Sequence, residues 1–416
     1  MFTNKRNNSI SAIFFSFTLT VIFISACSNS DSNSATGNQT PTRSTADLNG
    51  NYHLAGQQLL DATNPATTEV WSWTGIMNFD GNGGCSYTGT NETGVRRYET
   101  VSPPTLEYKI GTPDSNSCTY SFTADGTLTF GGDTKYYVSD DTNTIVGANT
   151  YGTVDTMIKQ SNVSLNNASL NGTYHYTSLN NVLTTSMTVD NAVIASMTFD
   201  GAGNCSYSES VNFSKQRTEN VSPRLIDSVQ GSLANFNCTY DLATDGTLSI
   251  DGSARYAVGA DTNVIIGIEN AQDVDMIAVS HIAMIKNVDS GLTNASIQGK
   301  FMDVNSRLEL YSDWTESWVW GGVIEFDGAG ACTYTGKFIQ GISRNESVNP
   351  WVITLMNVTP VNASCSYDLT SNGVLSINGK PTYVVSPDTN AIVGVAEDVG
   401  NSFVTTYFDR LVRLPN

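Results

Sequence analysis

Polar and apolar residues alternate over short runs along most of the chain, and glycine and asparagine separate the runs. A period of two is typical of β-strands with one buried face, and no long stretch has a helical period. Between residues 169 and 290 the pattern predicts eight strands and a last apolar stretch, at 172–178, 192–199, 204–211, 217–222, 236–243, 247–251, 254–259, 264–269 and 274–286. Eight or nine antiparallel strands in about 120 residues indicate an all-β domain. A closed barrel and a two-sheet sandwich both fit, and hairpins at nearly every joint favour the barrel.

The same sequence pattern occurs three times, which predicts three tandem β-domains at 47–163, 169–290 and 296–416. Each copy carries two cysteines separated by the same 33 positions. Six cysteines allow fifteen pairings in principle. Threefold repetition selects one disulfide within each copy, worth roughly 3 to 4 kcal/mol on the chain-entropy model. The predicted pairs are Cys85 with Cys118, Cys205 with Cys238, and Cys332 with Cys365.

The stretch F-D-G-N-G-G-C at residues 79–85 is compatible with a calcium loop or a tight hairpin turn. Its counterparts at 199–205 and 326–332 keep only one acidic side chain, too few for a calcium loop, so we predict a turn with glycines at positive φ. A second shared motif, Y-x-V-x-x-D-T-N, is interpreted in the same way. Its aspartates, Asp141, Asp261 and Asp388, are expected to begin Asx-type turns.

The motif R-x-E-x-V-[SN]-P recurs at 97–103, 217–223 and 344–350. An arginine and a glutamate two residues apart on a strand share one face and can pair. On the outside such a pair adds at most about 1 kcal/mol, whereas inside a barrel it can orient a polar ligand. Retention in all three copies favours the structural role. The candidate binding residues from this motif are Arg97, Glu99, Arg344 and Glu346.

The copies differ most in the strand before F-D-G. Copies one and three carry tryptophan pairs on one strand face, Trp71 with Trp73 and Trp318 with Trp320, followed by Gly75 and Gly322. Copy two has Asn191 and Val193 in their place. Two indoles beside a glycine can line a pocket for a sugar ring or an apolar group, although a stripe of period two is more often core. We therefore expect any ligand site to lie in copies one and three.

Composition limits the chemistry. With only 3 histidines, the chain cannot repeat a Ser-His-Asp triad or a histidine metal cluster three times. The formal net charge of −19 makes nucleic acid and anionic lipid surfaces poor partners. We expect no catalytic residue, no metal and no cofactor.

The N-terminus has the features of an export signal. Lys5 and Arg6 precede an apolar run from residue 10 to 24, which ends in Ile24-Ser25-Ala26-Cys27. This resembles the lipobox of bacterial lipoproteins, which implies a signal peptide at 1–26 and acylation of Cys27. The alternative is a single membrane-spanning helix, for which the run is short. Serine at position 28 implies the outer membrane. Residues 27–46 are then a disordered tether holding the protein to the lipid bilayer.

The first strand of each copy carries Gly-x-aromatic, as Gly50-x-Tyr52, Gly172-x-Tyr174 and Gly299-x-Phe301. Followed by a meander of hairpins, this is loosely similar to the calycin group of lipocalin-like and avidin-like barrels, which implies a ligand cavity. The leading hypothesis is a non-enzymatic envelope lipoprotein that binds a small ligand, a glycan, an apolar group or a partner protein. A structural spacer or adhesin-like module is the alternative, and a glycan-acting enzyme is the least favoured.

Overall fold

The computed structural model describes residues 43–59, 64, 66–112, 114–131, 134–148, 152–273, 275–288, 290–348, 351–399 and 404–415. Residues 1–42, which include the predicted signal peptide, Cys27 and most of the predicted tether, lie outside the described residues. Among the helices in the described part of the chain, none is long and apolar enough to cross a bilayer.

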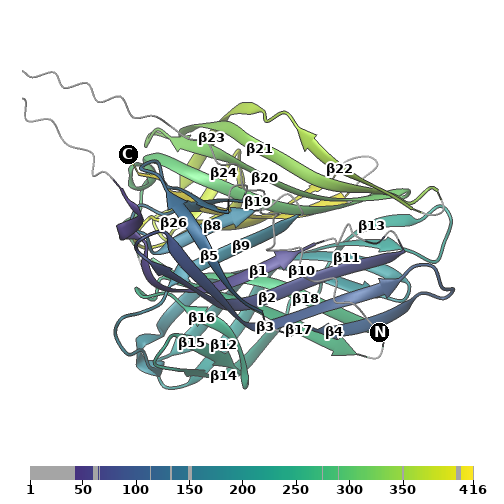
Figure 1. Ribbon diagram of the computed structural model, residues 1–416, viewed down its shortest axis with the longest axis horizontal. Helices are drawn as coiled ribbons and strands as arrows, with labels where there is room; N and C mark the ends of the chain where they lie inside the picture. Colours follow the sequence, from purple (N-terminus) through teal and green to yellow (C-terminus); the bar gives the residue numbers. More distant parts are fainter. Residues whose placement is uncertain are drawn as a thin grey trace, which may run out of the picture. The chain divides into compact units, whose positions relative to one another are not determined.

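The described chain is all-β, with three short 3₁₀ helices before the first strands of the three copies (Figure 1). The first copy consists of β1 (Asn49–Gln58), β2 (Thr67–Asp80), β3 (Gly84–Tyr98), β4 (Thr105–Ile110), β5 (Ser115–Phe122), β6 (Thr127–Phe130), β7 (Thr134–Val138), β8 (Thr144–Ala148) and β9 (Thr153–Lys159). The second consists of β10 (Asn171–Thr184), β11 (Met187–Asp200), β12 (Asn204–Thr218), β13 (Leu225–Gln230), β14 (Asn235–Leu242), β15 (Thr247–Ile250), β16 (Ser253–Val258), β17 (Val264–Asp273) and β18 (Met276–Lys286). The third consists of β19 (Gly299–Leu310), β20 (Trp314–Phe326), β21 (Ala331–Asn345), β22 (Val352–Val358), β23 (Asn362–Leu369), β24 (Val374–Ile377), β25 (Lys380–Val385), β26 (Ala391–Val399) and β27 (Val404–Arg413).

Each copy is a closed antiparallel barrel of eight strands, so the predicted fold class is confirmed. In the first copy the order is β2-β1-β9-β8-β7-β6-β5-β3, and pairing of β2 with β3 closes the ring. The ninth strand, β4, pairs with the second half of β3 while β5 pairs with the first half. Closure removes the sheet edges that an open sheet would expose. We call the three units barrels 1, 2 and 3.

The predicted disulfides are confirmed. Each joins two cysteines that face one another in register, as Cys85 and Cys118 do on β3 and β5, with Cα atoms 4.8 Å apart. The other two bridges, Cys205–Cys238 and Cys332–Cys365, repeat this geometry. Each disulfide covalently joins the third strand of its barrel to the fifth.

The strand predictions for the second copy need one correction. The strand expected at 204–211 continues to Thr218 as β12, so no separate strand forms at 217–222, and the next strand, β13, was not expected. The cause is a β-bulge opposite Ile194 and Ala195, where the register shifts and the alternation of side chains along β12 changes phase. The period-two pattern in the sequence therefore breaks at the bulge although the strand continues.

The stretch 79–85 forms the predicted hairpin turn between β2 and β3. The Asp80 carboxylate accepts hydrogen bonds from the backbone amides of Asn82 at 2.7 Å and Gly84 at 2.9 Å. Gly81 and Gly83 have φ of 74° and 96°, the left-handed region that favours glycine. The counterparts of Asp80 make the same two bonds, so this carboxylate serves the turn in all three copies; they are Asp200 and Asp327.

Apolar side chains form two kinds of core. Inside each barrel, rings pack edge to face, as Tyr52, Phe79 and Tyr120 do in barrel 1. A second core lies between the barrels and takes buried side chains from all three, including Ile158 of barrel 1 and Phe408 of barrel 3. The three barrels therefore pack against one another through apolar surface that each would otherwise expose to water.

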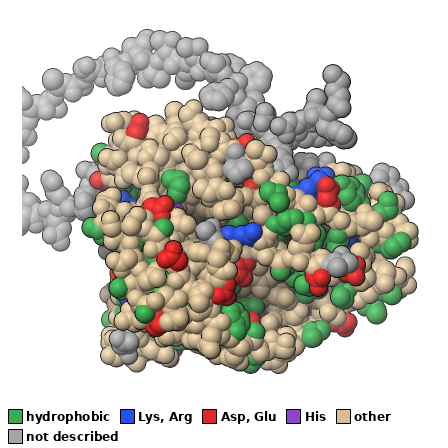
Figure 2. All heavy atoms as spheres, turned by 90° about the horizontal axis from the view of Figure 1, so that it is seen from below, with side chains coloured by type: hydrophobic (Ala, Val, Ile, Leu, Met, Phe, Trp, Pro, Cys, Tyr) green, Lys and Arg blue, Asp and Glu red, His purple; other side chains and the backbone are tan. Residues whose placement is uncertain are grey.

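The surface fits the acidic composition. Figure 2 shows one face, on which acidic side chains are scattered among neutral and hydrophobic ones and basic side chains are few. This face has no broad basic patch of the kind that binds a phosphate backbone.

Candidate functional site

The R-x-E motifs lie neither on the outer surface nor inside a barrel. Their arginines end the long strands β3, β12 and β21, and all three side chains are buried between the barrels. The side chains of the paired glutamates are also buried, with exposed fractions of 6 % for Glu99, 2 % for Glu219 and 0 % for Glu346. We call these six residues the Arg–Glu ring: Arg97, Glu99, Arg217, Glu219, Arg344 and Glu346.

Each arginine of the ring pairs with the glutamate of its own barrel and reaches into the next. Arg97 Nε donates to Glu99 at 2.8 Å, and its Nη2 lies 3.1 Å from Glu219 of barrel 2. Arg217 pairs with Glu219 at 2.9 Å and with Glu346 of barrel 3 at 3.0 Å. Arg344 pairs with Glu346 at 2.6 Å and donates to the backbone carbonyl of Thr67 in barrel 1 at 3.1 Å. The links therefore run from barrel 1 to 2, 2 to 3, and 3 to 1.

Electrostatics favour the ionised form of two glutamates of the ring, Glu219 and Glu346. Burial opposes the charge of Glu219, but Arg217 and Arg97 outweigh it and hold the pKa of Glu219 below its usual value. The pKa of Glu346 is lowered in the same way, by Arg344 and Arg217 against the effect of burial. Arg224 adds a bond of 2.8 Å to each of these two carboxylates.

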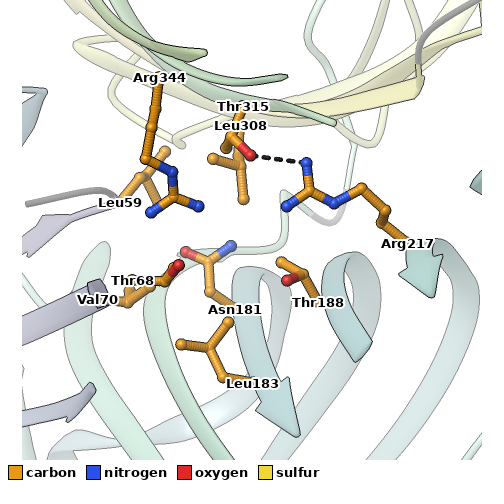
Figure 3. Close-up of a pocket in the computed structure, with 10 residues that line it drawn as sticks. All are labelled: Leu59, Thr68, Val70, Asn181, Leu183, Thr188, Arg217, Leu308, Thr315 and Arg344. Atoms are coloured by element: carbon orange, nitrogen blue, oxygen red, sulfur yellow. Dashed lines mark hydrogen bonds between the residues drawn. The ribbon is translucent and has the colours of Figure 1, made fainter. Parts of the chain in front are cut away.

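The space at the centre of the ring is too small for an organic ligand. Figure 3 shows Arg217 and Arg344 pointing toward one another across side chains from all three barrels, with Arg217 bonded to Thr315. The cavity there is about 10 Å³, room for about one water molecule. The geometry thus indicates a structural role, in which buried ion pairs join the barrels, for the four candidate binding residues Arg97, Glu99, Arg344 and Glu346.

The D-T-N motifs also converge. The aspartate of each motif begins the predicted Asx turn. In barrel 1, for example, the backbone amide of Asn143 donates to the Asp141 carboxylate at 3.0 Å. The aspartates come from three different barrels, yet one carboxylate oxygen from each lies within 4.8 Å of the others. We call Asp141, Asp261 and Asp388 the Asp trio.

Asparagines join the Asp trio across barrels. Asn390 donates to Asp141 at 2.9 Å, and Asn263 donates to Asp388 at 3.3 Å. Burial and the nearby Asp388 raise the pKa of Asp261. Among the described residues the Asp trio is the group whose carboxylates are close enough to share a cation, and its hydrogen bonds are also those of a junction between barrels.

The predicted tryptophans fill barrels 1 and 3. Trp71 and Trp318 are each 8 % exposed, and each indole lies over a glycine of the facing strand, Gly94 or Gly341, where a Cβ would sit about 2.5 Å from the ring. Trp73 is half-buried against Gly56, and Trp320 is half-buried with the Arg307 guanidinium 4.5 Å from its ring centroid. This packing favours the core-filling interpretation of the stripe.

Barrel 2 has a different lining at the same level. Residues paired in register form a rung across neighbouring strands. In barrel 3 one rung runs from Trp318 to Arg307 to Tyr407. The matching rung of barrel 2 holds smaller polar side chains, Asn191, Asn180, Ser280 and Glu269.

A cavity of about 210 Å³ lies against this rung in barrel 2. We call it the barrel 2 cavity, and its lining is Ile250, Ser253, Arg255, Tyr256, Glu269, Asn270, Ala271, Ala278 and Ser280. At about 30 Å³ for each molecule, the space equals about seven waters, enough for a small organic ligand. Asn191 Oδ1, on the same rung, is buried without a hydrogen-bond partner among the described residues.

One substitution explains why a carboxylate faces this cavity. In barrels 1 and 3 an inward tyrosine donates to an aspartate of the last strand, as Tyr136 does to Asp155 at 2.6 Å and Tyr383 to Asp409 at 2.7 Å. Barrel 2 has buried Ile282 at that position, on the rung of Val193.

Tyr256 donates instead to Glu269 on β17, whose side chain is exposed to the cavity. Burial raises the pKa of Glu269 to about 7, and the charge of Arg255 opposes the shift. Neither Arg255 nor Glu269 was among the residues that sequence reasoning selected. The available signal was the absence of tryptophan from copy two.

No protein-family model matches the chain, and no curated protein is similar to it in sequence. Among solved structures, the chain is similar to the isotype 1 transferrin binding protein B from serogroup B Neisseria meningitidis at 8% identity, over 87% of this chain and 76% of that chain. The TM-score of 0.16 is too low to carry an inference about function.

Proposed function

We propose that the protein is a non-enzymatic, lipid-anchored protein of the cell envelope that binds a small ligand in barrel 2. The observation that carries this proposal is the contrast between the barrels. Tryptophans occupy the inward faces of barrels 1 and 3, whereas barrel 2 has a cavity of about 210 Å³ lined by polar side chains. A pure spacer has no need of an open cavity lined by an arginine and a glutamate.

The lipobox-like residues that end at Cys27 support an anchor in the outer membrane. The Arg–Glu ring supports the remainder of the arrangement. Because each arginine binds the next barrel, barrels 1 and 3 hold barrel 2 in a fixed position.

A filling substitution tests the binding function. Asn191→Trp places in barrel 2 the residue that barrels 1 and 3 carry at the matching position. The full chain is purified in mild detergent, incubated with the low-molecular-mass fraction of a cell extract, and analysed by native mass spectrometry after washing. We expect the unmodified chain to retain a small molecule and Asn191→Trp to retain none. Equal spectra from the two proteins would refute a ligand site in this barrel.

The anchor is tested separately. Metabolic labelling with a radioactive fatty acid should mark the natural chain and leave Cys27→Ser unmarked. Labelling of both chains, or of neither, would contradict acylation at Cys27.

A second function, a structural spacer or adhesin-like module, is favoured by the Arg–Glu ring itself. A cyclic set of buried links gives a rigid unit whether or not a ligand binds. The native mass spectra decide between the two functions, because a spacer retains no ligand.

A further inference from the structure

The barrel 2 cavity holds two opposite charges that do not satisfy one another. Arg255 and Glu269 both line it, and neither forms an ion pair within the part of the chain that the structure describes. Glu269 accepts a hydrogen bond from Tyr256 and keeps further acceptor capacity toward the cavity, since a carboxylate offers about four lone-pair sites. Arg255 is half-buried, and its charge is close enough to lower the pKa of Glu269.

The remaining lining selects for a compact polar molecule. Ser253 and Ser280 offer hydroxyl groups that donate or accept, whereas Ala271 and Ala278 leave room for a short apolar group. The size equals about seven water molecules. An apolar ligand would strip water from both charges without replacing it, and a neutral sugar would leave both charges uncompensated.

We propose that the barrel 2 cavity binds a small zwitterion, an α-amino acid, with its carboxylate toward Arg255 and its ammonium group toward Glu269. This inference rests on the proposed function, since it names the ligand class of the same cavity. A guanidinium binds a carboxylate through paired hydrogen bonds, and a carboxylate binds an ammonium group by a charge-assisted bond. One molecule with both charges compensates both side chains at once.

The pH dependence of binding follows from the groups that face Glu269. They are Arg255 and Tyr256 on β16, Tyr176 on β10, and Tyr207 on β12. The pKa values of Tyr176 and Tyr207 are raised by burial, so both rings are neutral near pH 7. Desolvation raises the pKa of Glu269 above its usual value although its side chain is exposed, so the ionised form that binds ammonium decreases as the pH falls from 8 to 6.

The test measures amino-acid binding to the full chain in mild detergent. Each of the twenty standard L-amino acids is titrated by calorimetry at pH 8, and propylamine, propionate and glucose serve as single-charge and neutral probes. We expect at least one amino acid to bind, its N-acetyl derivative and methyl ester to bind at least about tenfold more weakly, and the three simple probes not to bind. Binding is expected to be weaker at pH 6 than at pH 8.

Variants locate the site. Glu269→Gln and Arg255→Met should each weaken binding at least about tenfold, and Glu269→Gln should also remove the change between pH 6 and pH 8. Lys300→Met, which removes an exposed cation on β19 of barrel 3, is the matched control and should bind as the unmodified chain does. Circular dichroism confirms that each variant is folded.

The outcomes separate this inference from the proposed function. Binding of glucose or propylamine that Asn191→Trp abolishes, with no amino acid bound, overturns the zwitterion and leaves a ligand cavity in barrel 2. Amino-acid binding that survives both Asn191→Trp and Glu269→Gln overturns the site assignment. Absence of binding by any probe, together with equal native mass spectra of the natural chain and Asn191→Trp, overturns both.

Discussion

Arg217→Met removes the central link of the Arg–Glu ring. Arg217 donates to the backbone carbonyls of Tyr311 at 3.1 Å and Trp314 at 3.2 Å, and to the Thr315 hydroxyl at 2.8 Å, all in the hairpin between β19 and β20. It also pairs with Glu219 and Glu346. All three acceptors share the two hydrogens of Arg217 Nη1, so the substitution removes about two hydrogen bonds and leaves two buried carboxylates with fewer partners.

The size of the effect follows from these contacts. Two hydrogen bonds at about 1 kcal/mol each give about 2 kcal/mol. Removing one partner of a buried ion pair costs about 3 to 5 kcal/mol. Because Arg224 still bridges Glu219 and Glu346, we expect the lower end for the ion pairs, and the total loss is about 5 kcal/mol in the free energy of unfolding at pH 7. The control Lys109→Met breaks a pair in which the side chains are 21% and 39% exposed, which is worth up to about 1 kcal/mol.

The pH dependence gives a second measurement. The folded-state pKa of Glu219 is depressed, so its stabilisation is complete above the unfolded-state pKa of about 4.3 and is lost as the pH falls through the folded-state value. The difference between the natural chain and Arg217→Met should therefore shrink as urea unfolding is moved from pH 7 to pH 3. A loss equal to that of Lys109→Met, or a loss that does not depend on pH, would refute this account of the ring.

The other predictions concern the cysteines, the indoles and the carboxylates. Thiol titration of the denatured Cys27→Ser chain should find no free thiol, and two or more free thiols would contradict the three disulfides. Trp73→Ala should cost about 3 to 5 kcal/mol of stability in urea unfolding, as a large-to-small change in a packed core does, and a small cost with lost ligand binding would restore the tryptophan pocket. Asp261→Asn should raise the melting temperature in a chelator at pH 7, because burial and Asp388 disfavour the charge of Asp261, and the gain should disappear at acidic pH where that carboxyl is protonated. Excess calcium should leave the melting temperature of the natural chain unchanged; a rise that Asp261→Asn abolishes would assign a cation to the Asp trio.

Local signals predicted the barrels well. The period of two, the Asp-Gly turns and the spacing of the cysteines each act within one hairpin or repeat three times, so they can be read without knowing how the chain packs. The bulge opposite Ile194 and Ala195 was missed because it preserves the strand while shifting the side-chain alternation. The cavity was missed for a related reason. The cavity lies where barrel 2 has smaller side chains than barrel 3 does, and no residue type in the sequence marks an empty space.

The amino-acid sequence by itself determined the fold class, the threefold repeat and the disulfide pairs. Tertiary structure alone decided what the repeated polar motifs do. Arg344 and Thr67 lie 277 positions apart, and Asp141, Asp261 and Asp388 come from three different barrels. A motif on one strand specifies which face a side chain points to, but whether that face meets water, a barrel interior or another barrel depends on how the closed barrels dock. Docking of the three barrels buries apolar surface from all of them at once. The same docking brings the arginines and glutamates together between the barrels, whereas the cavity lies within barrel 2.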